Sequence, residues 1–317
     1  MVVVDAQLPE IKDTEQAWLQ SRVGSYVGLS HRVVRHLASG GMAHVFLAER
    51  EPCGSYAAVK LSDQPRGVPD LLLREEAVML AGVHHPNIVE LIEHSKTHDG
   101  LDYLLLGYAR GVEVDEWLRY SGPTITRARL FNVLWQLAAA LDYLHANGIV
   151  HGDLKPGNVM VDAFARDRVT LVDFGLAFRE GCSRERHGSY GTPGYMAPEQ
   201  LAGAVCGPAI DRFALAALAL ELLSARGLLT RARLRQLSRQ GKSHVDAIPY
   251  LTHEGLRQVF ARGLSADPAE RFASARELIG ALESAVVRSA VLERRAVRTR
   301  KPKPQRAATL AAAKACM

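Results

Sequence analysis

The octapeptide HGDLKPGN occupies residues 151–158, and the tripeptide DFG follows at residues 173–175. The first segment places a carboxylate (Asp153), a cation (Lys155) and an amide (Asn158) in one short stretch. A single aspartate is most often a turn former, because its side chain hydrogen-bonds the nearby backbone. A base, a cation and oxygen ligands in this order instead indicate a site that neutralises the charge of a phosphate group.

A lysine at the end of an apolar run supplies a further charge. The segment AAVK ends at Lys60, and a buried ammonium group needs an acidic partner because an unpaired buried charge is costly. Glu76, on a predicted helix at residues 71–80, is the candidate carboxylate. A lone strand lysine is usually a surface residue. Here HGDLKPGN and DFG follow Lys60 and Glu76 along the chain. Chance is therefore a poor explanation for the presence of all these residues together.

A turn of small residues, ASGGMAHV at residues 38–45, lies between two predicted strands. Backbone N–H groups along Ala38, Gly40 and Gly41 could approach phosphate oxygens there, and Val45 could pack on a purine ring. Only Gly40 of the three glycines usual in such loops is in register. Taken alone, this segment leaves a tight β-hairpin as the alternative.

The predicted elements divide the chain into two parts. Short β-rich runs at residues 32–61 precede one helix (71–80) and two strands (88–92 and 103–106). After Gly111 the pattern becomes helical. Predicted helices cover residues 127–147, 211–225, 254–261 and 274–286, and strand-like runs at 159–161 and 170–172 flank a turn. We therefore expect an α+β protein with a small β-rich lobe that carries one helix, and a larger α-helical lobe.

Together these segments resemble the protein kinase family over about residues 32–286, and bacterial serine/threonine kinases in particular. The resemblance implies a two-lobed kinase fold that uses ATP and Mg²⁺ and phosphorylates serine or threonine in protein substrates. It implies that Lys60 holds the α- and β-phosphates and pairs with Glu76. Asp153 would accept or orient the hydroxyl proton, and Lys155 would steady the transferred phosphate.

The resemblance also implies the remaining ligand contacts. Asn158 and Asp173 would bind Mg²⁺, Leu106 would be the gatekeeper, and the backbone of residues 107–109 would meet adenine. The nucleotide-binding residues implied in this way are Ala38, Gly40, Gly41, Val45, Ala58, Lys60, Leu106, Tyr108, Ala109 and Asn158.

The segment GTPGYMAPE at residues 191–199 resembles the end of a kinase activation segment. The resemblance implies that Thr192 lines the acceptor site and that Glu199 forms a buried ion pair with Arg271. Asp211 is similar to an aspartate that begins a helix and anchors the catalytic loop through backbone N–H groups.

Two residues depart from the family pattern. Gly152 replaces the arginine that in many kinases receives an activation-segment phosphate, and Ala38 replaces the first loop glycine. Without that guanidinium group a phosphate has lost its usual partner. We therefore predict activity without phosphorylation of Ser183 or Ser189, or control from the flanking segments. The change at Ala38 could stiffen the loop without preventing nucleotide binding.

Two alternatives to a protein kinase remain open. HGD followed by an asparagine also occurs in small-molecule kinases of the aminoglycoside and choline phosphotransferase type, but these usually lack a lysine at the position of Lys155 and a segment such as residues 191–199. A pseudokinase scaffold would bind partners without catalysis. Intact Lys60, Asp153, Asn158 and Asp173 speak against that reading.

Charge distribution separates the end of the chain from its body. The net charge is +5, but residues 288–317 hold nine Lys/Arg against Glu293 alone, which leaves 30 basic and 33 acidic residues before them. We predict a leader at residues 1–28 with one short helix near residues 14–19, a kinase domain at 29–287 with lobes at 29–108 and 109–287, and a disordered basic tail at 288–317. The tail could bind an acidic partner. It has no aromatic residues to stack on bases, so nucleic acid is not favoured.

Composition also bears on the compartment. Of the 317 residues, 48% are hydrophobic, which is enough for a large core, but no run is long and uncharged enough to span a membrane. The four cysteines, Cys53, Cys182, Cys206 and Cys316, lack paired spacing, which argues against a disulfide framework or a zinc site. We therefore expect a cytoplasmic protein with free thiols.

Overall fold

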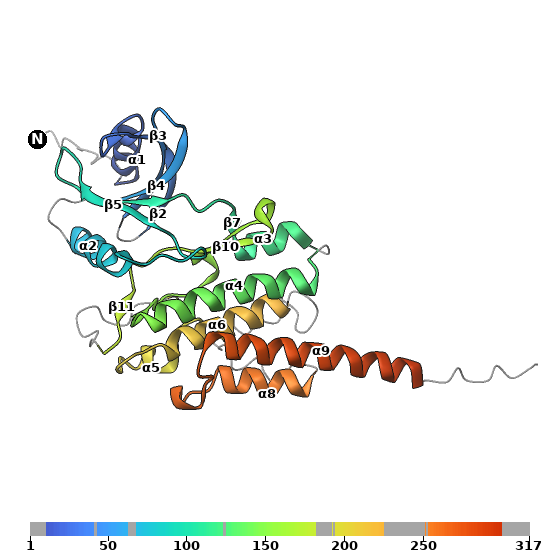
Figure 1. Cartoon of the computed structure of the whole chain (residues 1–317). Helices are drawn as coiled ribbons and strands as arrows, with labels where there is room; N and C mark the ends of the chain where they lie inside the picture. The colour runs from blue at the N-terminus through green and yellow to red at the C-terminus, as the bar shows by residue number, and fades with distance from the viewer. Residues whose placement is uncertain are drawn as a thin grey trace, which may run out of the picture.

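The structure, a computed structural model, describes residues 11–40, 43–62, 68–122, 125–181, 192, 194–224, 251 and 253–299. Side chains at 11–14, 68–69 and 290–299 are not described. Two lobes are stacked, with a sheet and two helices in the first and helices in most of the second (Figure 1). The predicted α+β class is confirmed.

The first lobe is built on a six-stranded antiparallel sheet with the strand order β1-β2-β3-β4-β6-β5. The strands are β1 (Tyr26–Val27), β2 (His31–Ser39), β3 (His44–Arg50), β4 (Ser55–Leu61), β5 (Leu91–Lys96) and β6 (Asp102–Gly107). Burial alternates along β4, where Ala57, Val59 and Leu61 are buried, because successive side chains point to opposite faces of a strand. Helix α2 (Val68–Leu80) packs against this sheet and carries Glu76.

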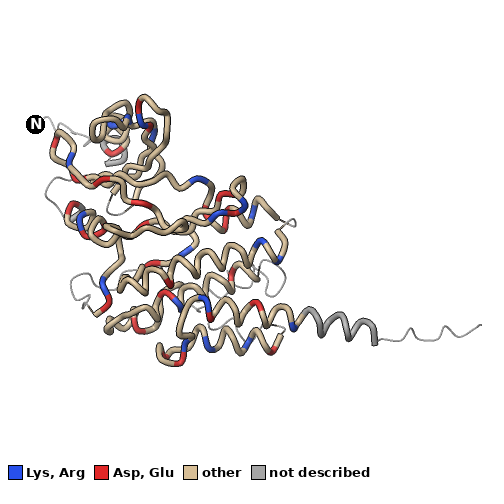
Figure 2. The backbone as a smooth tube through the Cα atoms, viewed as in Figure 1, with Lys and Arg blue, Asp and Glu red and all other residues tan. Residues whose placement is uncertain are grey.

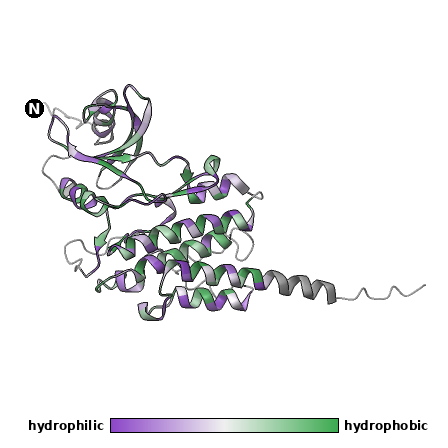
Figure 3. Ribbon diagram, in the orientation of Figure 1, coloured by the Kyte–Doolittle hydropathy of each residue, from purple (hydrophilic) through white to green (hydrophobic). Residues whose placement is uncertain are grey.

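The second lobe is built around α6 (Ala209–Leu223), which is buried on nearly every side. A helix that is apolar all round is stable only inside a core. Helices α4 (Arg127–Ala146), α8 (Glu254–Gly263) and α9 (Ala275–Thr299) pack against it, and the lobe also contains α3 (Val114–Ser121) and α5 (Pro198–Leu201). Figure 3 shows the hydrophobic residues gathered along α4 and α6. Thr126 begins α4 as its N-cap, because its side chain accepts a hydrogen bond from the N–H of Arg129.

Short strands frame the loops between the lobes. β9 (Val159–Asp162) pairs with β10 (Arg168–Leu171) and with β7 (Val112–Glu113), and β8 (Ile149–Val150) pairs with β11 (Phe178–Arg179). Two short 3₁₀ helices, η2 (Pro156–Asn158) and η3 (Ala163–Ala165), lie beside β9, and η6 (Pro268–Glu270) precedes α9. The strands predicted at residues 159–161 and 170–172 are therefore confirmed. These pairings fix both ends of the segment that holds HGDLKPGN.

One predicted strand is displaced. The sequence analysis expects a strand at residues 88–92, but β5 begins at Leu91. Val89 instead donates its N–H to the carbonyl oxygen of Leu171 in the second lobe, and Ile88 forms an isolated bridge with the same residue. The apolar run at residues 88–92 therefore connects the lobes first and enters the sheet only afterwards.

Both predicted domain boundaries need correction. Helix α1 (Ile11–Arg22) is longer than the predicted helix, Trp18 and Leu19 pack on the core of the sheet, and β1 pairs with β2, so the first lobe begins before residue 29. At the other end α9 continues to Thr299, and the prediction of disorder is wrong for residues 288–299. Alanine, leucine, glutamate and arginine dominate there, and all four favour helix. Residues 300–317 lie outside the described residues.

Charge is distributed over both lobes. Figure 2 shows Lys and Arg interspersed with Asp and Glu on the described elements of each lobe. Among the described residues, no helix has the length and apolar character needed to cross a membrane. Cys53 and Cys206 form no disulfide bond within the part of the chain that the structure describes, whereas Cys182 and Cys316 lie outside it.

Candidate functional site

A cleft of about 720 Å³ lies between the sheet of the first lobe and the loops of the second. Thirteen of the predicted site residues line it: Ala38, Gly40, Val45, Ala58, Lys60, Glu76, Leu106, Tyr108, Ala109, Asp153, Lys155, Asn158 and Asp173. Gly41 lies outside the described residues. A volume of this size is typical of a cleft that encloses a small-molecule ligand.

Lys60 on β4 joins the two lobes. Its Nζ lies 2.7 Å from Glu76 Oε2 on α2 and 2.7 Å from Asp173 Oδ1 in the second lobe. Burial opposes the charge of Lys60, but the two carboxylates more than offset it and raise its pKa above the ordinary value. Lys60 therefore carries a positive charge that is fixed at the floor of the cleft.

Asp173 is held as an anion. Burial favours the neutral acid, yet the Lys60 ammonium group lowers the pKa of Asp173 to about 2. Its backbone has a φ of 64°, a left-handed conformation that is uncommon outside glycine. The next residue is tied to α2, because Phe174 donates its N–H to Glu76 Oε1 over 3.1 Å. The phenyl ring of Phe174 also meets the ring of His151 edge-on, with centroids 4.9 Å apart.

Asp153 accepts hydrogen bonds from three sides. Lys155 Nζ lies 2.7 Å from its Oδ2, and Asn158 Nδ2 donates to its carbonyl oxygen over 2.8 Å. Thr192 donates to Oδ1 through its N–H (3.1 Å) and its hydroxyl group (3.2 Å). The structure therefore brings the predicted base, the predicted cation and the predicted acceptor-site threonine together. A hydroxyl group can sit beside the Asp153 carboxylate, as the Thr192 hydroxyl does.

The loop before Asp153 is anchored by Asp211 in the first turn of α6. Its carboxylate accepts the N–H groups of His151 and Gly152, each over 2.9 Å, and lies 2.8 Å from His145 Nε2. Burial opposes the charge, but the bond with His145 lowers the pKa of Asp211 below its ordinary value. The predicted helix-start anchor is thus present.

The structure explains why residue 152 is glycine, which the sequence alone did not. Its φ is +79°, and an added Cβ would come within 2.6 Å of the carbonyl oxygen of Leu176. Glycine, in place of the arginine of many kinases, is therefore found where the loop at residues 151–158 closely approaches the segment after DFG. Gln200, also missed, donates to the carbonyl oxygen of Gly152 over 3.0 Å. No sequence pattern marks Gln200, because its contact depends on the fold alone.

Glu199 and Arg271 form the ion pair that the sequence predicts. The two N–O distances are 2.6 and 2.8 Å, and the guanidinium group also donates to the carbonyl oxygens of Ala209 and Ser265. Arg271 lies 5.0 Å from the ring centroid of Phe213 and is buried. This pair lies outside the cleft and ties α5 to the loops beside α6 and α9.

Apolar side chains from both lobes also line the cleft. Val45 and Ala58 come from the sheet, while Met160 and Val172, which the sequence analysis missed, come from the second lobe. Ala58 pairs with Leu106 across β4 and β6. The signal available for Met160 was its spacing of two residues from Asn158, at the start of a predicted strand in which alternate residues share a face. A planar apolar ligand such as a purine fits between these walls.

The residues present fit a magnesium ion bound together with phosphates. Asn158 uses its Nδ2 as a donor to Asp153, which leaves its Oδ1 free to accept, and the Asp173 side chain keeps 46% of its surface exposed. Within the described residues, no group of three or more His, Cys, Asp or Glu is arranged to hold a metal alone. Mg²⁺ in phosphate-binding sites commonly takes only one or two protein ligands and completes its shell with phosphate and water.

Comparisons with known proteins agree with this geometry. A family model described as "Protein kinase domain" matches residues 31–280. The serine/threonine-protein kinase pkn2 of Myxococcus xanthus is 33% identical over 270 residues, which cover 80% of this chain and 32% of that protein. PknD of Mycobacterium tuberculosis is 31% identical over 278 residues, 84% of this chain and 41% of that protein. The chain thus spans about a third of the length of the curated relatives it matches.

The fold has solved counterparts. The crystal structure of the Mycobacterium tuberculosis PknI kinase domain has a TM-score of 0.61 and 24% sequence identity. The match covers 83% of this chain and 98% of that chain. At this identity the likeness concerns the fold alone.

Proposed function

Because this chain belongs to the protein kinase family, we propose that it transfers the γ-phosphate of ATP to serine or threonine hydroxyl groups of protein substrates. The observation that carries the proposal is the convergence of Lys60, Asp153, Asn158 and Asp173 on one cleft. A transferring phosphoryl group needs positioning and charge neutralisation more than covalent help. These four side chains supply both.

Each residue has a task in this proposal. The Lys60 ammonium group binds the α- and β-phosphates, and Glu76 keeps it from swinging away. Asp153 orients the acceptor hydroxyl group and takes its proton as the new O–P bond forms. The bond between the γ-phosphorus and the β–γ bridging oxygen breaks and ADP leaves, while Lys155 neutralises the transferred phosphate. Asn158 and Asp173 would hold Mg²⁺, which when bound neutralises negative charge on the phosphates.

The acceptor class follows from the surroundings of Asp153. The Thr192 hydroxyl group lies 3.2 Å from the Asp153 carboxylate. An incoming serine or threonine would place its own hydroxyl group beside the same carboxylate. The segment after Thr192, fixed by the Glu199–Arg271 pair, offers a surface for a peptide backbone. A small-molecule kinase would not need this segment. We infer that this activity serves signalling in the cytoplasm, where ATP is available.

Mass spectrometry tests this function directly. The purified protein is incubated with Mg²⁺ and ATP, alone and with a generic serine-rich protein, and phosphorylated residues are mapped. We expect phosphoserine or phosphothreonine, lost on omission of Mg²⁺ and lowered about a thousandfold in Asp153→Asn. Transfer only to small hydroxylated molecules would favour the phosphotransferase alternative. Nucleotide binding without any transfer would favour a pseudokinase.

A further inference from the structure

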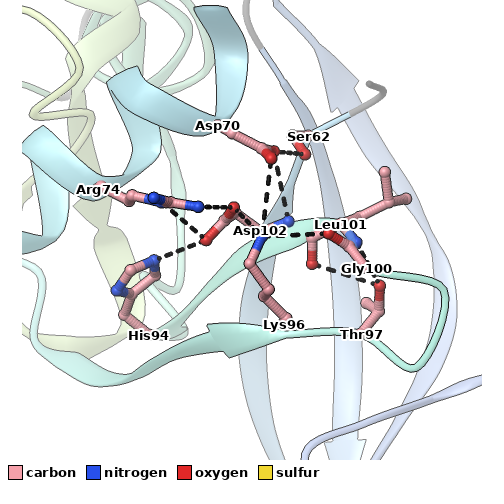
Figure 4. Close-up of polar contacts among 9 residues, drawn as sticks. All are labelled: Ser62, Asp70, Arg74, His94, Lys96, Thr97, Gly100, Leu101 and Asp102. Carbon is pink, nitrogen blue, oxygen red and sulfur yellow. Dashed lines mark hydrogen bonds and ion pairs between the residues drawn. The ribbon is translucent and has the colours of Figure 1, made fainter. Parts of the chain in front are cut away.

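A buried carboxylate lies outside the cleft, where β6 begins. Asp102 is only 2% exposed, and cationic or ionisable groups surround it (Figure 4). Arg74 on α2 donates to both of its oxygens, over 3.3 and 3.0 Å. Lys96 Nζ lies 2.5 Å away and His94 Nε2 lies 3.2 Å away, both from β5. Asp102, at the start of β6, therefore connects α2 with the edge strand β5.

A second carboxylate on α2 continues this network. Asp70, one helical turn before Arg74, accepts a hydrogen bond from the Ser62 hydroxyl group over 2.5 Å and one from the Asp102 N–H over 3.4 Å. Both Asp70 and Ser62 are buried. Ser62 follows β4 directly, two residues after Lys60. The end of β4 and helix α2 are thus joined twice, once at Lys60 and Glu76 and once at Ser62 and Asp70.

Two attachments along a helix define its axis, whereas one does not. Asp70 and Glu76 are about 9 Å apart along α2, given the rise of an α-helix. The Lys60–Glu76 contact alone would leave α2 free to pivot about that point. The bonds of Asp70 and Arg74 fix the N-terminal half of the helix, and so fix the direction from which Glu76 reaches Lys60.

These bonds join residues of the first lobe to one another. All the residues labelled in Figure 4, Asp102, Arg74, Asp70 and Ser62 among them, come from α2, the sheet and the loops between its strands. At the catalytic loop Gly152 offers no side chain, so a phosphate on the activation segment would have no guanidinium group there to bind. The contacts of Asp70 and Arg74 that orient α2 therefore do not involve the activation segment.

The charges are arranged for a strong attachment. Burial alone would raise the pKa of Asp102, but its bonds with Arg74 and Lys96 hold it well below the ordinary value. Arg74 binds both oxygens with its planar fork, a geometry that fixes direction as well as distance. Removing Arg74 would leave the buried Asp102 carboxylate with fewer cationic partners and would remove its direct contact with α2.

We propose that Asp102, acting through Arg74 and Asp70, is a positioning site that keeps α2 oriented so that Glu76 engages Lys60 without help from a phosphorylated activation segment. The proposal rests on the proposed kinase function. The competing explanation is that the network only stabilises the fold of the first lobe. The two explanations differ in whether the effect of the network passes through Glu76.

A double-mutant cycle separates them. The affinity for Mg²⁺·ADP is measured by calorimetry for the wild type, Arg74→Met, Glu76→Gln and the double variant. We expect Arg74→Met to weaken binding about fivefold to tenfold in the wild type and to have almost no effect once Glu76 is Gln. Equal effects in both backgrounds, or no effect in either, would overturn the proposal. Asp102→Asn, which keeps the shape of the side chain, serves as the second variant and should behave like Arg74→Met.

Two further measurements keep the conclusions apart. Arg32→Met, which removes ion pairs with Glu49 and Glu51 on the same sheet, should leave nucleotide affinity unchanged. Phosphotransfer by the wild-type protein is measured alongside. If the wild type transfers no phosphate, the proposed function fails, whereas the binding cycle still decides the role of Asp102.

Discussion

Gly152 lies against Leu176 so closely that a Cβ on Gly152 would come within 2.6 Å of the Leu176 carbonyl oxygen. The loop that carries Asp153 and the segment that follows DFG are therefore in backbone contact at this point. In a kinase with arginine at this position a side chain must leave the backbone here. The two segments of this chain occupy the space that the first atom of such a side chain would need.

We expect Gly152→Ala to destabilise the protein by about 2 kcal/mol and to lower kcat, because the added methyl group must displace Leu176 and the adjoining DFG segment. Gly203→Ala is the matched control. Gly203 also has a positive φ (+67°), but nothing lies within 4 Å of the position that its added methyl group would take. Chemical denaturation and steady-state kinetics of the two variants check the difference, and equal losses would show that backbone strain alone is responsible.

Activity should not depend on activation-segment phosphorylation. Ser183 and Ser189 lie outside the described residues. In many kinases an arginine at the position of Gly152 binds a phosphate on this segment, but Gly152 has no side chain with which to bind it. We expect the Ser183→Ala/Ser189→Ala variant to keep most of the turnover rate of the purified wild type. A drop in kcat of about a hundredfold would contradict this prediction.

Local sequence predicted the parts of the site that are contiguous. HGDLKPGN brings Asp153, Lys155 and Asn158 together within one loop, so their chemistry could be inferred before any fold was known. Lys60 and Glu76 could also be named as candidate partners from local sequence, whereas the contact between Lys60 and Asp173 could not, because 113 residues separate the two.

The Asp102 network could not be predicted in this way. Its members come from α2, β5, β6 and the end of β4, and each is an ordinary polar residue in its own segment. The packing of α1 was missed for a related reason. One aromatic residue and one leucine in a polar helix give a weak periodic signal, and their partner is an apolar face of the sheet that only the fold reveals.

The α1 contact leads to a prediction of its own. The Trp18 ring lies 5.0 Å from the ring of His44 and 6.4 Å from that of Phe46, both on β3. We expect Trp18→Ala to lower the free energy of unfolding by about 1–2 kcal/mol, less than for a fully buried tryptophan. Gln16→Ala, an exposed change on the same helix, should have little effect. Urea denaturation compares the two, and an unchanged midpoint for Trp18→Ala would show that α1 contributes nothing.

Acid should weaken the link between the lobes at Asp173. Its pKa is about 2 in the folded protein and near 3.9 in an unfolded chain, so its contribution to stability is complete above about pH 5 and declines as pH falls toward 2. With its half-exposed side chain screened by solvent, that contribution is about 1 kcal/mol. We expect Asp173→Asn to lack this part of the decline in unfolding free energy between about pH 6 and pH 3. Parallel pH profiles for the two proteins would contradict the assignment.

The Glu199–Arg271 pair should be far more costly to break than an exposed ion pair. Arg271 is completely enclosed, and its guanidinium group satisfies two backbone carbonyl oxygens besides the carboxylate. We expect Arg271→Met to lower the free energy of unfolding by about 3–5 kcal/mol, because it leaves Glu199 as a nearly buried charge without its partner.

The double variant Glu199→Gln/Arg271→Met should recover part of that loss, since it removes the unpaired charge along with the cation. Arg257→Met is the matched control, because Arg257 forms an exposed pair with Glu254 within α8. Its loss should stay below about 0.5 kcal/mol. Urea denaturation of the four proteins checks the order, and similar losses for Arg257→Met and Arg271→Met would show that enclosure adds nothing to the strength of the Arg271 pair.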